Sequence, residues 1–180
     1  VEVANKTTNG LYRTGSLLSR NETIRFYQYV DTASVDPSEP CTLFAVQGSG
    51  QNYAVCLDED PTERVSIAEN VTSDDDSGSV LNSTLVTYTT GWYEIEVDWL
   101  STNAINVTVY NENGTVFATV NTTDSSYTSG GVGFSYWFMY GGWDFYSSRT
   151  YTASDPTYVF GLEQASGGAT AFASEDEEYS

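Results

Sequence analysis

Short runs in which hydrophobic and polar residues alternate are the main pattern along this 180-residue chain. In the clearest run, one face holds Tyr93, Ile95, Val97 and Trp99, and the other holds Glu94, Glu96 and Asp98. Such strict alternation is typical of a strand in an antiparallel sheet with one buried face. Similar runs, separated by Gly, Asn, Asp and Ser clusters, predict strands near residues 23–31, 41–47, 51–57, 63–68, 84–90, 91–100, 104–111, 115–121, 131–138 and 156–162. The sequence contains no helix-period run of useful length, so we expect an all-β protein.

The segment after this run predicts a β-hairpin. Asn113-Gly114 is a two-residue turn of the type I′ class. The resulting register pairs residues of like polarity: inside, Val109 with Ala118 and Val107 with Val120; outside, Tyr110 with Phe117, Thr108 with Thr119 and Asn106 with Asn121.

The remaining segments set the expected domain organisation. Two stretches read as loops, 73–79 and 140–143, the second around Gly141-Gly142. We expect one β-sandwich domain over residues 1–164, with residues 1–10 as an N-terminal arm. Residues 165–180 read as a Gly/Ala/Ser stretch followed by an acidic tail.

The charge balance excludes several classes of function. The chain has 25 acidic residues, 6 basic residues and no histidine, for a net charge of -19. It cannot neutralise phosphates, which argues against nucleic acid and anionic membranes as partners. The absence of histidine excludes a Ser-His-Asp triad and a histidine-based zinc site.

Dispersed acidic residues with a single lysine, Lys6, also point to a habitat. In concentrated salt the Debye length falls to about 3 Å, and self-repulsion is screened. We therefore expect a halophilic, archaeal protein; an acidic extracellular domain of ordinary habitat is the alternative.

Cys41 and Cys56 are the only cysteines. If Gly48-Ser49 is a turn, Phe44 pairs with Tyr53 and the two cysteines lie opposite each other. A cross-strand disulfide is then expected, contributing about 3 kcal/mol by loop entropy. Two free, buried thiols are the alternative.

Seven Asn-X-Ser/Thr triplets occur, where the composition gives about three by chance. The excess predicts N-glycosylation of a secreted or surface protein, at Asn5, Asn21, Asn70, Asn82, Asn106, Asn113 and Asn121. Glycans on Asn106 and Asn121 would crowd each other. The start at Val1 fits removal of a signal segment, and the apolar runs are too short to insert in a membrane.

Three motifs resemble a concanavalin A-like (laminin G-like) domain. They are the strand Gly91-Trp92-Tyr93-Glu94-Ile95-Glu96-Val97-Asp98-Trp99, the hairpin from Val107 to Val120, and Tyr127-Thr128-Ser129-Gly130-Gly131-Val132-Gly133-Phe134. The similarity covers about residues 85–146 well and 23–57 loosely. The resemblance implies an antiparallel two-sheet jelly-roll sandwich, a fold common in extracellular glycan-binding, adhesive and glycan-cleaving proteins. A fold does not by itself fix an activity.

The acidic face of the first run is one candidate site. Carboxylates on alternating strand positions lie about 7 Å apart, a separation that glycoside hydrolases use. Some concanavalin-like glucanases carry Glu-x-Asp-x-Glu on such a strand, whereas Glu94, Glu96 and Asp98 follow a different order. A solvent-facing acidic strand is the alternative.

Eight of the 13 residues from Phe134 to Tyr146 are aromatic. Rigid amphipathic rings stack on sugars or anchor protein interfaces. We expect Trp137, Tyr140 and Trp143 to be exposed and to bind a ligand; a place in the core or at the sandwich edge is the alternative.

Two acidic loops suggest calcium, the one cofactor that the sequence indicates. They are 58–60 and the run Asp74, Asp75 and Asp76. Laminin G-like domains often bind calcium, so the resemblance implies a metal site at Asp74, Asp75 and Asp76. Neither run has EF-hand spacing, and solvated loops are the alternative.

These inferences lead to one main expectation and two alternatives. We expect a secreted, non-catalytic binding or adhesion module, whose partner is a glycan or a surface protein. A structural subunit of a surface filament or virion spike is the first alternative, a homo-oligomer joined through sheet edges or termini with residues 1–4 as an exchanged strand. A glycoside hydrolase is the second.

Overall fold

A computed structural model describes residues 2–5, 9–33, 39–59, 62–73, 77–137 and 139–153. Within these ranges, the side chains of residues 2–5, 9–11, 137, 139–141 and 145 are not described. The described residues form twelve strands in two antiparallel six-stranded sheets. The expected all-β, two-sheet sandwich is confirmed. The described part of the chain contains no helix long and apolar enough to cross a membrane.

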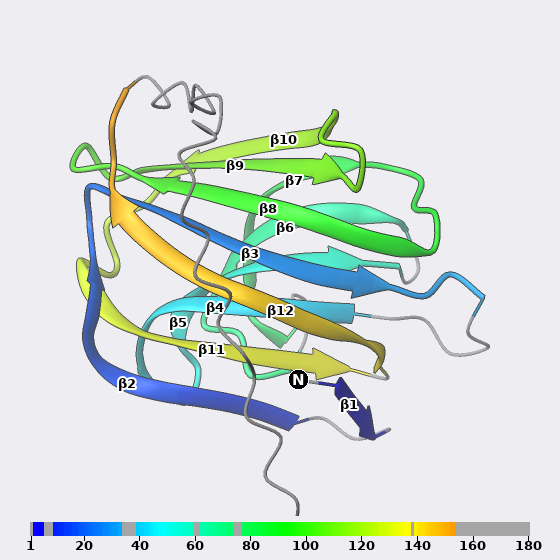
Figure 1. The fold of residues 1–180 in the computed structure, drawn as a ribbon. Coiled ribbons are helices and arrows are strands. Elements are labelled where there is room, and N and C mark those ends of the chain that lie inside the picture. The colour runs from blue at the N-terminus through cyan, green and yellow to red at the C-terminus, as the bar shows by residue number, and fades with distance from the viewer. Residues whose placement is uncertain are drawn as a thin grey trace, which may run out of the picture.

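The front sheet in Figure 1 carries the run from Gly91 to Trp99 at its centre. Its spatial order is β1 (Glu2–Asn5), β12 (Met139–Thr150), β3 (Glu22–Val30), β8 (Gly91–Trp99), β9 (Ala104–Asn111) and β10 (Val116–Thr123).

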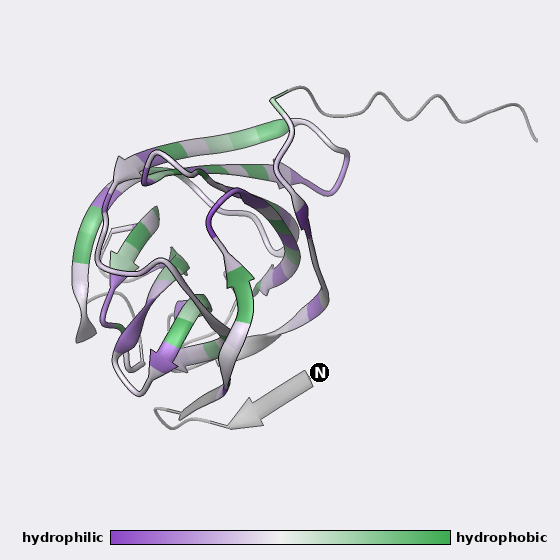
Figure 2. Cartoon of the chain, turned by 90° about the vertical axis from the view of Figure 1, so that its left-hand side faces the viewer, coloured by the Kyte–Doolittle hydropathy of each residue, from purple (hydrophilic) through white to green (hydrophobic). Residues whose placement is uncertain are grey.

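The rear sheet lies behind it in the same view. Its order is β2 (Asn9–Ser19), β11 (Ser129–Trp137), β4 (Glu39–Gly48), β5 (Gln51–Asp58), β6 (Arg64–Glu69) and β7 (Ser79–Leu85). Alternating hydrophobic and hydrophilic bands run along the strands of both sheets (Figure 2). This alternation turns one side of each strand toward the space between the sheets.

The core is built on aromatic contacts between the two sheets. Trp99 on β8 is fully buried, and its ring lies 5.6 Å from that of Phe44 and 6.1 Å from that of Tyr53, both on the rear sheet. Burying a large aromatic side chain contributes about 1.5–3 kcal/mol or more. These rings therefore fix how the two sheets stack.

The register of β8 and β9 follows the sequence pattern. Ile95 lies opposite Val109 and Val97 opposite Val107, all buried, while the acidic residues of β8 point away from the core. The expected pairs of the next hairpin are also present, among them Thr108 with Thr119 and Asn106 with Asn121.

One pair of this hairpin was predicted wrongly. Tyr110 lies opposite Val116, because a bulge between Val116 and Ala118 makes Phe117 an additional residue in β10. Phe117 turns inward, with its ring 4.9 Å from that of Tyr93. A bulge flips one residue to the opposite face, and the aromatic contact inside stabilises that flip.

The β4–β5 hairpin carries the disulfide that the sequence predicted. Phe44 lies opposite Tyr53, Cys41 lies opposite Cys56, and the two sulfurs are bonded. Both cysteines are completely buried. The bond closes a loop of 15 residues, for which chain entropy gives about 3 kcal/mol of stabilisation.

β7 protects the outer edge of β10. The Asn82 side chain donates to the Asn121 carbonyl at 2.7 Å, and Thr84 donates to the Thr119 carbonyl at 2.8 Å. These side chains thus bond to backbone carbonyls of β10 that could otherwise accept hydrogen bonds from another strand.

Several strand predictions were wrong. β7 spans 79–85 and not 84–90, while β2 and β12 were not predicted at all. The expected loop at 140–143 is part of β12, where Gly142 lies opposite Glu2 of β1.

The first residues of the chain therefore pair as a strand within the same chain. The strand predicted at 156–162 and the tail at 165–180 lie outside the described residues.

Candidate functional site

The outer face of β3 and β8 presents four rows of paired side chains. Both strands alternate, so every second residue points away from the core. The pairs across the ladder are Tyr29 with Trp92, Tyr27 with Glu94, Arg25 with Glu96, and Thr23 with Asp98. We call this surface the β3–β8 face. Successive rows lie about 7 Å apart along the strands.

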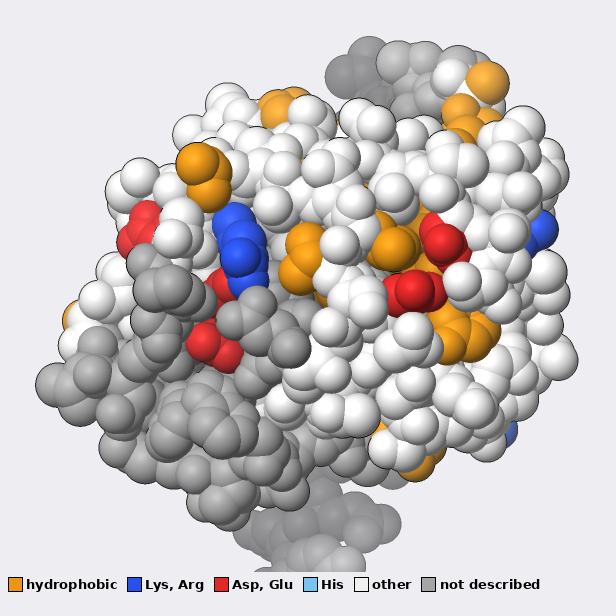
Figure 3. Space-filling view, turned by 180° about the vertical axis from the view of Figure 1, so that it is seen from behind, with side chains coloured by type: hydrophobic (Ala, Val, Ile, Leu, Met, Phe, Trp, Pro, Cys, Tyr) orange, Lys and Arg blue, Asp and Glu red, His pale blue; other side chains and the backbone are white. Residues whose placement is uncertain are grey.

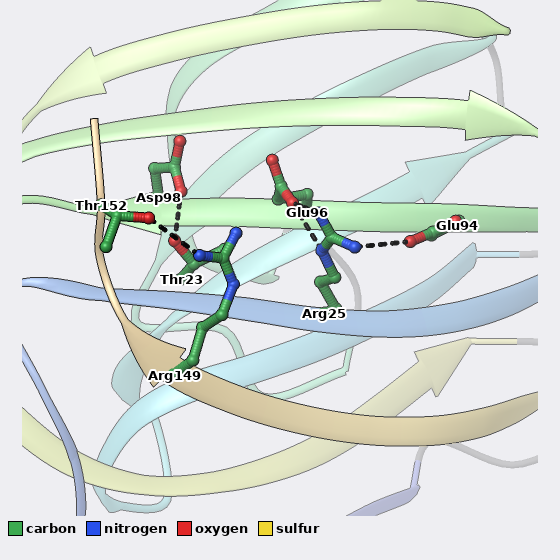
Figure 4. A network of polar contacts seen from close by, with 7 residues as sticks. All are labelled: Thr23, Arg25, Glu94, Glu96, Asp98, Arg149 and Thr152. Atoms are coloured by element: carbon green, nitrogen blue, oxygen red, sulfur yellow. Dashed lines mark hydrogen bonds and ion pairs between the residues drawn. The ribbon is translucent and has the colours of Figure 1, made fainter. Parts of the chain in front are cut away.

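Arg25 is the centre of the charged part of the β3–β8 face. Its Nε donates to Glu96 Oε2 at 2.5 Å, its second terminal nitrogen also contacts that oxygen, and its first lies 3.8 Å from Glu94 Oε1 (Figure 4). The side chains are 31% exposed for Arg25, 27% for Glu94 and 12% for Glu96. The guanidinium therefore holds two carboxylates in place; Arg25 and Glu94 remain partly exposed, and Glu96 is mostly buried.

In the next row a neutral donor holds Asp98. Thr23 donates its hydroxyl to Asp98 Oδ1 at 2.6 Å. Arg149 reaches over this row from β12 and donates to the Thr152 hydroxyl at 3.1 Å (Figure 4). Because Thr23 is only 1% exposed, Asp98 has a fixed orientation at this end of the β3–β8 face.

Aromatic side chains form the opposite end. The rings of Tyr29 and Trp92 meet edge to face, with centroids 5.4 Å apart and planes at 65°. In the adjoining row, partial burial and, secondarily, the charge of Glu94 raise the pKa of Tyr27. The Tyr27 hydroxyl therefore stays protonated near neutral pH and can donate a hydrogen bond.

The arrangement combines ring faces with charged hydrogen-bonding groups. Hydrogen bonds to ionised groups contribute about 1.5–3 kcal/mol each, and rigid rings add contact area at little entropic cost. A molecule with hydroxyl groups and flat apolar C–H surfaces matches this combination. The β3–β8 face is thus the candidate binding site.

The same geometry disfavours acid–base catalysis by Glu94 and Glu96. A general acid must hold a proton, and enzymes achieve this by burying the carboxyl or placing another carboxylate beside it. Here the group that contacts both carboxylates is a guanidinium, and it occupies Oε1 of Glu94 and Oε2 of Glu96 in ion pairs.

The expected exposure of Trp143 is wrong. Trp143 is only 4% exposed, and its ring lies 4.9 Å from that of Phe134 and 6.0 Å from that of Tyr136. With the Gln28 amide oriented to satisfy its neighbours, Gln28 Oε1 accepts from the indole Nε1 at 3.0 Å. Trp143 therefore belongs to a small second cluster between the sheets, the alternative that the sequence left open.

Tyr146, from the same aromatic segment, also packs inward and stacks on Phe26 at 6.2 Å. The side chains of the other two candidates, Trp137 and Tyr140, lie outside the described residues. Their role in ligand binding stays a prediction.

The acidic loops give no direct sign of a metal site. The described residues contain no group of three or more Cys, Asp or Glu side chains placed to hold a cation. Asp58 is 1% exposed and forms an ion pair with Arg64 at 2.8 Å. Asp74, Asp75 and Asp76 lie outside the described residues, so calcium binding there remains a prediction.

The described part of the rear face looks different from the β3–β8 face. In the view from behind, apolar side chains form small groups separated by other side chains and backbone, and one basic group lies beside acidic ones (Figure 3). Tyr12 on β2 provides an exposed aromatic ring on the rear sheet, with 41% of its surface accessible.

Sequence reasoning missed the aromatic end of the β3–β8 face and the arginine at its centre. The signal was available in the alternation of residues 23–31, which predicts Tyr27, Tyr29 and Arg25 on the outward side. The pairing of this segment with residues 91–99 could not be read from the sequence, because the two are about 70 residues apart.

The fold resembles that of several carbohydrate-binding proteins. No protein-family model matches the chain, and no curated protein sequence does. The carbohydrate-binding module CBM66 from Bacillus subtilis superposes with a TM-score of 0.56 at 12% identity, over 79% of this chain and 93% of that one. The exoplasmic/lumenal domain of VIP36, bound to Ca2+ and Man3GlcNAc, gives 0.57 at 9% identity, over 82% and 76%.

A toad ovary galectin in complex with thio-digalactose gives a TM-score of 0.51 at 9% identity, over 78% of this chain and 98% of the galectin. At these identities the comparisons establish the shared fold, a concanavalin-like β-sandwich.

Proposed function

We propose that this protein is a secreted, non-catalytic carbohydrate-binding module that holds its ligand on the β3–β8 face. The observation that carries the proposal is the Tyr29–Trp92 ring pair, in line with Tyr27, Glu94 and Arg25 on one partly exposed surface. A sugar ring stacks its C–H face on the aromatic end, and its hydroxyl groups bond to the charged row.

Three similar folds support this ligand class. The names of these proteins record a carbohydrate-binding module, a Man3GlcNAc complex and a thio-digalactose complex. The disulfide and the excess of glycosylation triplets support secretion, because disulfides persist in oxidising compartments.

Glycan-array screening tests the proposal, followed by titration calorimetry with the oligosaccharide that gives the strongest signal. Trp92→Ala and Arg25→Ala should each weaken binding at least about tenfold, equivalent to about 1.4 kcal/mol. Tyr12→Ala is the matched control, since it removes an exposed ring from the rear sheet. An array without signal, or unchanged affinity in both front-sheet variants, contradicts the proposal.

A structural subunit joined by strand exchange is the second candidate. It is favoured by β1, a four-residue strand at the edge of the front sheet that pairs with β12 over Glu2–Asn5 and Met139–Gly142. The same segment of a second copy could form the same ladder. Sedimentation should then show oligomers that disappear when residues 1–10 are deleted; identical sedimentation of both forms would exclude this assembly.

A further inference from the structure

The tip of the β9–β10 hairpin carries one of the seven glycosylation triplets, and its setting differs from the others. Asn113, Gly114 and Thr115 are all exposed, as are the flanking residues Glu112 and Val116. The triplet lies between the strands and not within one. A transferase could therefore reach both the asparagine and the hydroxyl residue two positions later.

Hydrogen bonds fix the orientation of the Asn113 amide. Its Oδ1 accepts from the Thr115 backbone N at 3.0 Å and from the Thr115 hydroxyl at 2.7 Å. The backbone of the turn is closed by bonds between Asn111 and Gly114, and between Asn111 and Thr115. Because the two amide heavy atoms point about 120° apart, Oδ1 faces the turn and Nδ2 faces away from it.

The triplets at Asn21 and Asn70 lie in turns but are partly inaccessible. Thr23, the hydroxyl residue for Asn21, is 1% exposed and donates to Asp98. The middle residue of the other triplet, Val71, is 1% exposed, and Asn70 Oδ1 accepts from the Tyr127 hydroxyl at 2.5 Å.

The triplets at Asn82, Asn106 and Asn121 begin within strands. The Asn82 Nδ2 atom, which would be modified, already donates to the Asn121 carbonyl. Asn106 and Asn121 lie opposite each other in the ladder, and Asn106 is only partly exposed. The side chain of Asn5 is outside the described residues.

We infer that Asn113 is the N-glycan attachment site of the folded protein. The reaction forms a bond between Asn113 Nδ2 and the anomeric carbon of a lipid-linked oligosaccharide. The bond from that carbon to the lipid-phosphate oxygen breaks, the lipid phosphate leaves with the electron pair, and a base of the transferase takes the Nδ2 proton.

A glycan on Asn113 would stand near the aromatic end of the β3–β8 face, because Asn111 lies opposite Tyr93, the neighbour of Trp92. It would leave from the end of the front sheet, beyond Asn111. Glycans on Asn106 would instead stand in the row of Asp98, on the outer side of the sheet. Glycosylation at the hairpin tip does not depend on the proposed carbohydrate binding.

The test uses the full-length, oxidised protein as acceptor for an oligosaccharyltransferase with a lipid-linked oligosaccharide. Glycopeptide mass spectrometry after a time course measures the occupancy of each triplet. We expect modification of the folded protein at Asn113 at least about tenfold faster than at Asn70 or Asn82. In the reduced, urea-unfolded chain, rates at the three asparagines should approach one another.

Variants at the same turn separate accessibility from misfolding. Asn113→Gln and Thr115→Ala should abolish modification at position 113 of the folded chain, whereas Thr115→Ser should retain it; circular dichroism checks that each is folded. Asn82→Gln is the matched control and should leave occupancy at Asn113 unchanged. Faster modification of the folded protein at Asn70 or Asn82, or an unmodified Asn113 in folded protein, overturns the inference.

Discussion

Replacing Tyr53 by phenylalanine tests whether one core hydroxyl fixes the loop between β10 and β11. The Tyr53 ring packs against Trp99 and Tyr127, with centroids 6.1 Å and 5.0 Å away. Its hydroxyl donates to Asp124 Oδ1 at 2.5 Å and accepts from the Tyr127 backbone N at 3.1 Å. Phenylalanine retains the ring contacts and removes both hydrogen bonds.

The expected cost follows from the groups left without this hydroxyl. A hydrogen bond to an ionised group contributes about 1.5–3 kcal/mol, and a buried donor without its partner costs about 1–3 kcal/mol. Asp124 is partly open to solvent and keeps its bond from the Ser126 N at 2.7 Å, so water replaces part of the loss. We expect Tyr53→Phe to lower the free energy of unfolding by about 2 kcal/mol at pH 7.

The loss should depend on pH in one direction. Burial alone would raise the pKa of Asp124, but the hydrogen bonds from Tyr53 and Ser126 outweigh burial and lower it below its usual value of 3.8. A carboxyl group with a lowered folded-state pKa stabilises the fold above its unfolded-state pKa and loses that contribution as the pH falls through the folded-state value. The difference between wild type and Tyr53→Phe should therefore be full at pH 7 and smaller below about pH 4.

Urea denaturation at pH 7 and pH 3, followed by tryptophan fluorescence, measures the difference. Tyr127→Phe is the control, because its hydroxyl donates to the neutral side chain of Asn70 and its effect should not follow the charge of Asp124. An equal loss at both pH values in Tyr53→Phe, or a loss below about 0.5 kcal/mol at pH 7, refutes the assigned role of the hydroxyl.

Three further predictions concern the core, the disulfide and the charge. Trp99→Ala should cost about 3–5 kcal/mol in urea denaturation, because Trp99 is fully buried between the sheets; a cost near 1 kcal/mol would mean that the sheets do not depend on it. Cys41→Ala combined with Cys56→Ala should cost about 3 kcal/mol, and a reducing agent should then have no added effect on the variant. Raising KCl from 0.1 M to 3 M should raise the Tm in calorimetry, because salt screens the repulsion of a net charge of -19; a constant or falling Tm would contradict the halophilic interpretation.

The parts of the fold that the sequence predicted correctly are those in which local patterns and global packing agree. Alternation placed Ile95 and Val97 inside, and the Asn113-Gly114 turn set the ladder of β9 and β10. The expected turn at Gly48-Ser49 was wrong by one residue, since Gly48 pairs with Gln51 around a turn at Ser49-Gly50, but a register shift between Phe44 and Gly48 leaves Cys41 opposite Cys56 as predicted. In these hairpins the partners lie within about 20 residues, so local pattern and turn position limit the possible registers.

The errors arose where distant contacts decide the structure. In β12, Gly141 and Gly142 carry the local signal of a turn, yet their backbone partners are Val3 and Glu2, more than 130 residues away. The bulge at Phe117 depends on an aromatic space beside Tyr93 that belongs to another strand. Neither partner is visible to a local pattern, because strand pairing over long separations is set by the whole sheet.

In the candidate site, too, the sequence predicted which residues face outward but not which residues they pair with. Alternation assigned Glu94, Glu96 and Asp98 to an outward face. In a chain with 25 acidic residues, an acidic face by itself does not indicate a binding site. What makes it distinctive is Arg25, one of only six basic residues, which the β3–β8 ladder places against two of these carboxylates. The same ladder sets Tyr29 beside Trp92. Because a scarce basic residue and aromatic rings converge there from segments about 70 residues apart, the site is a property of the sheet pairing. Composition alone indicated the aromatic segment at 134–146 instead.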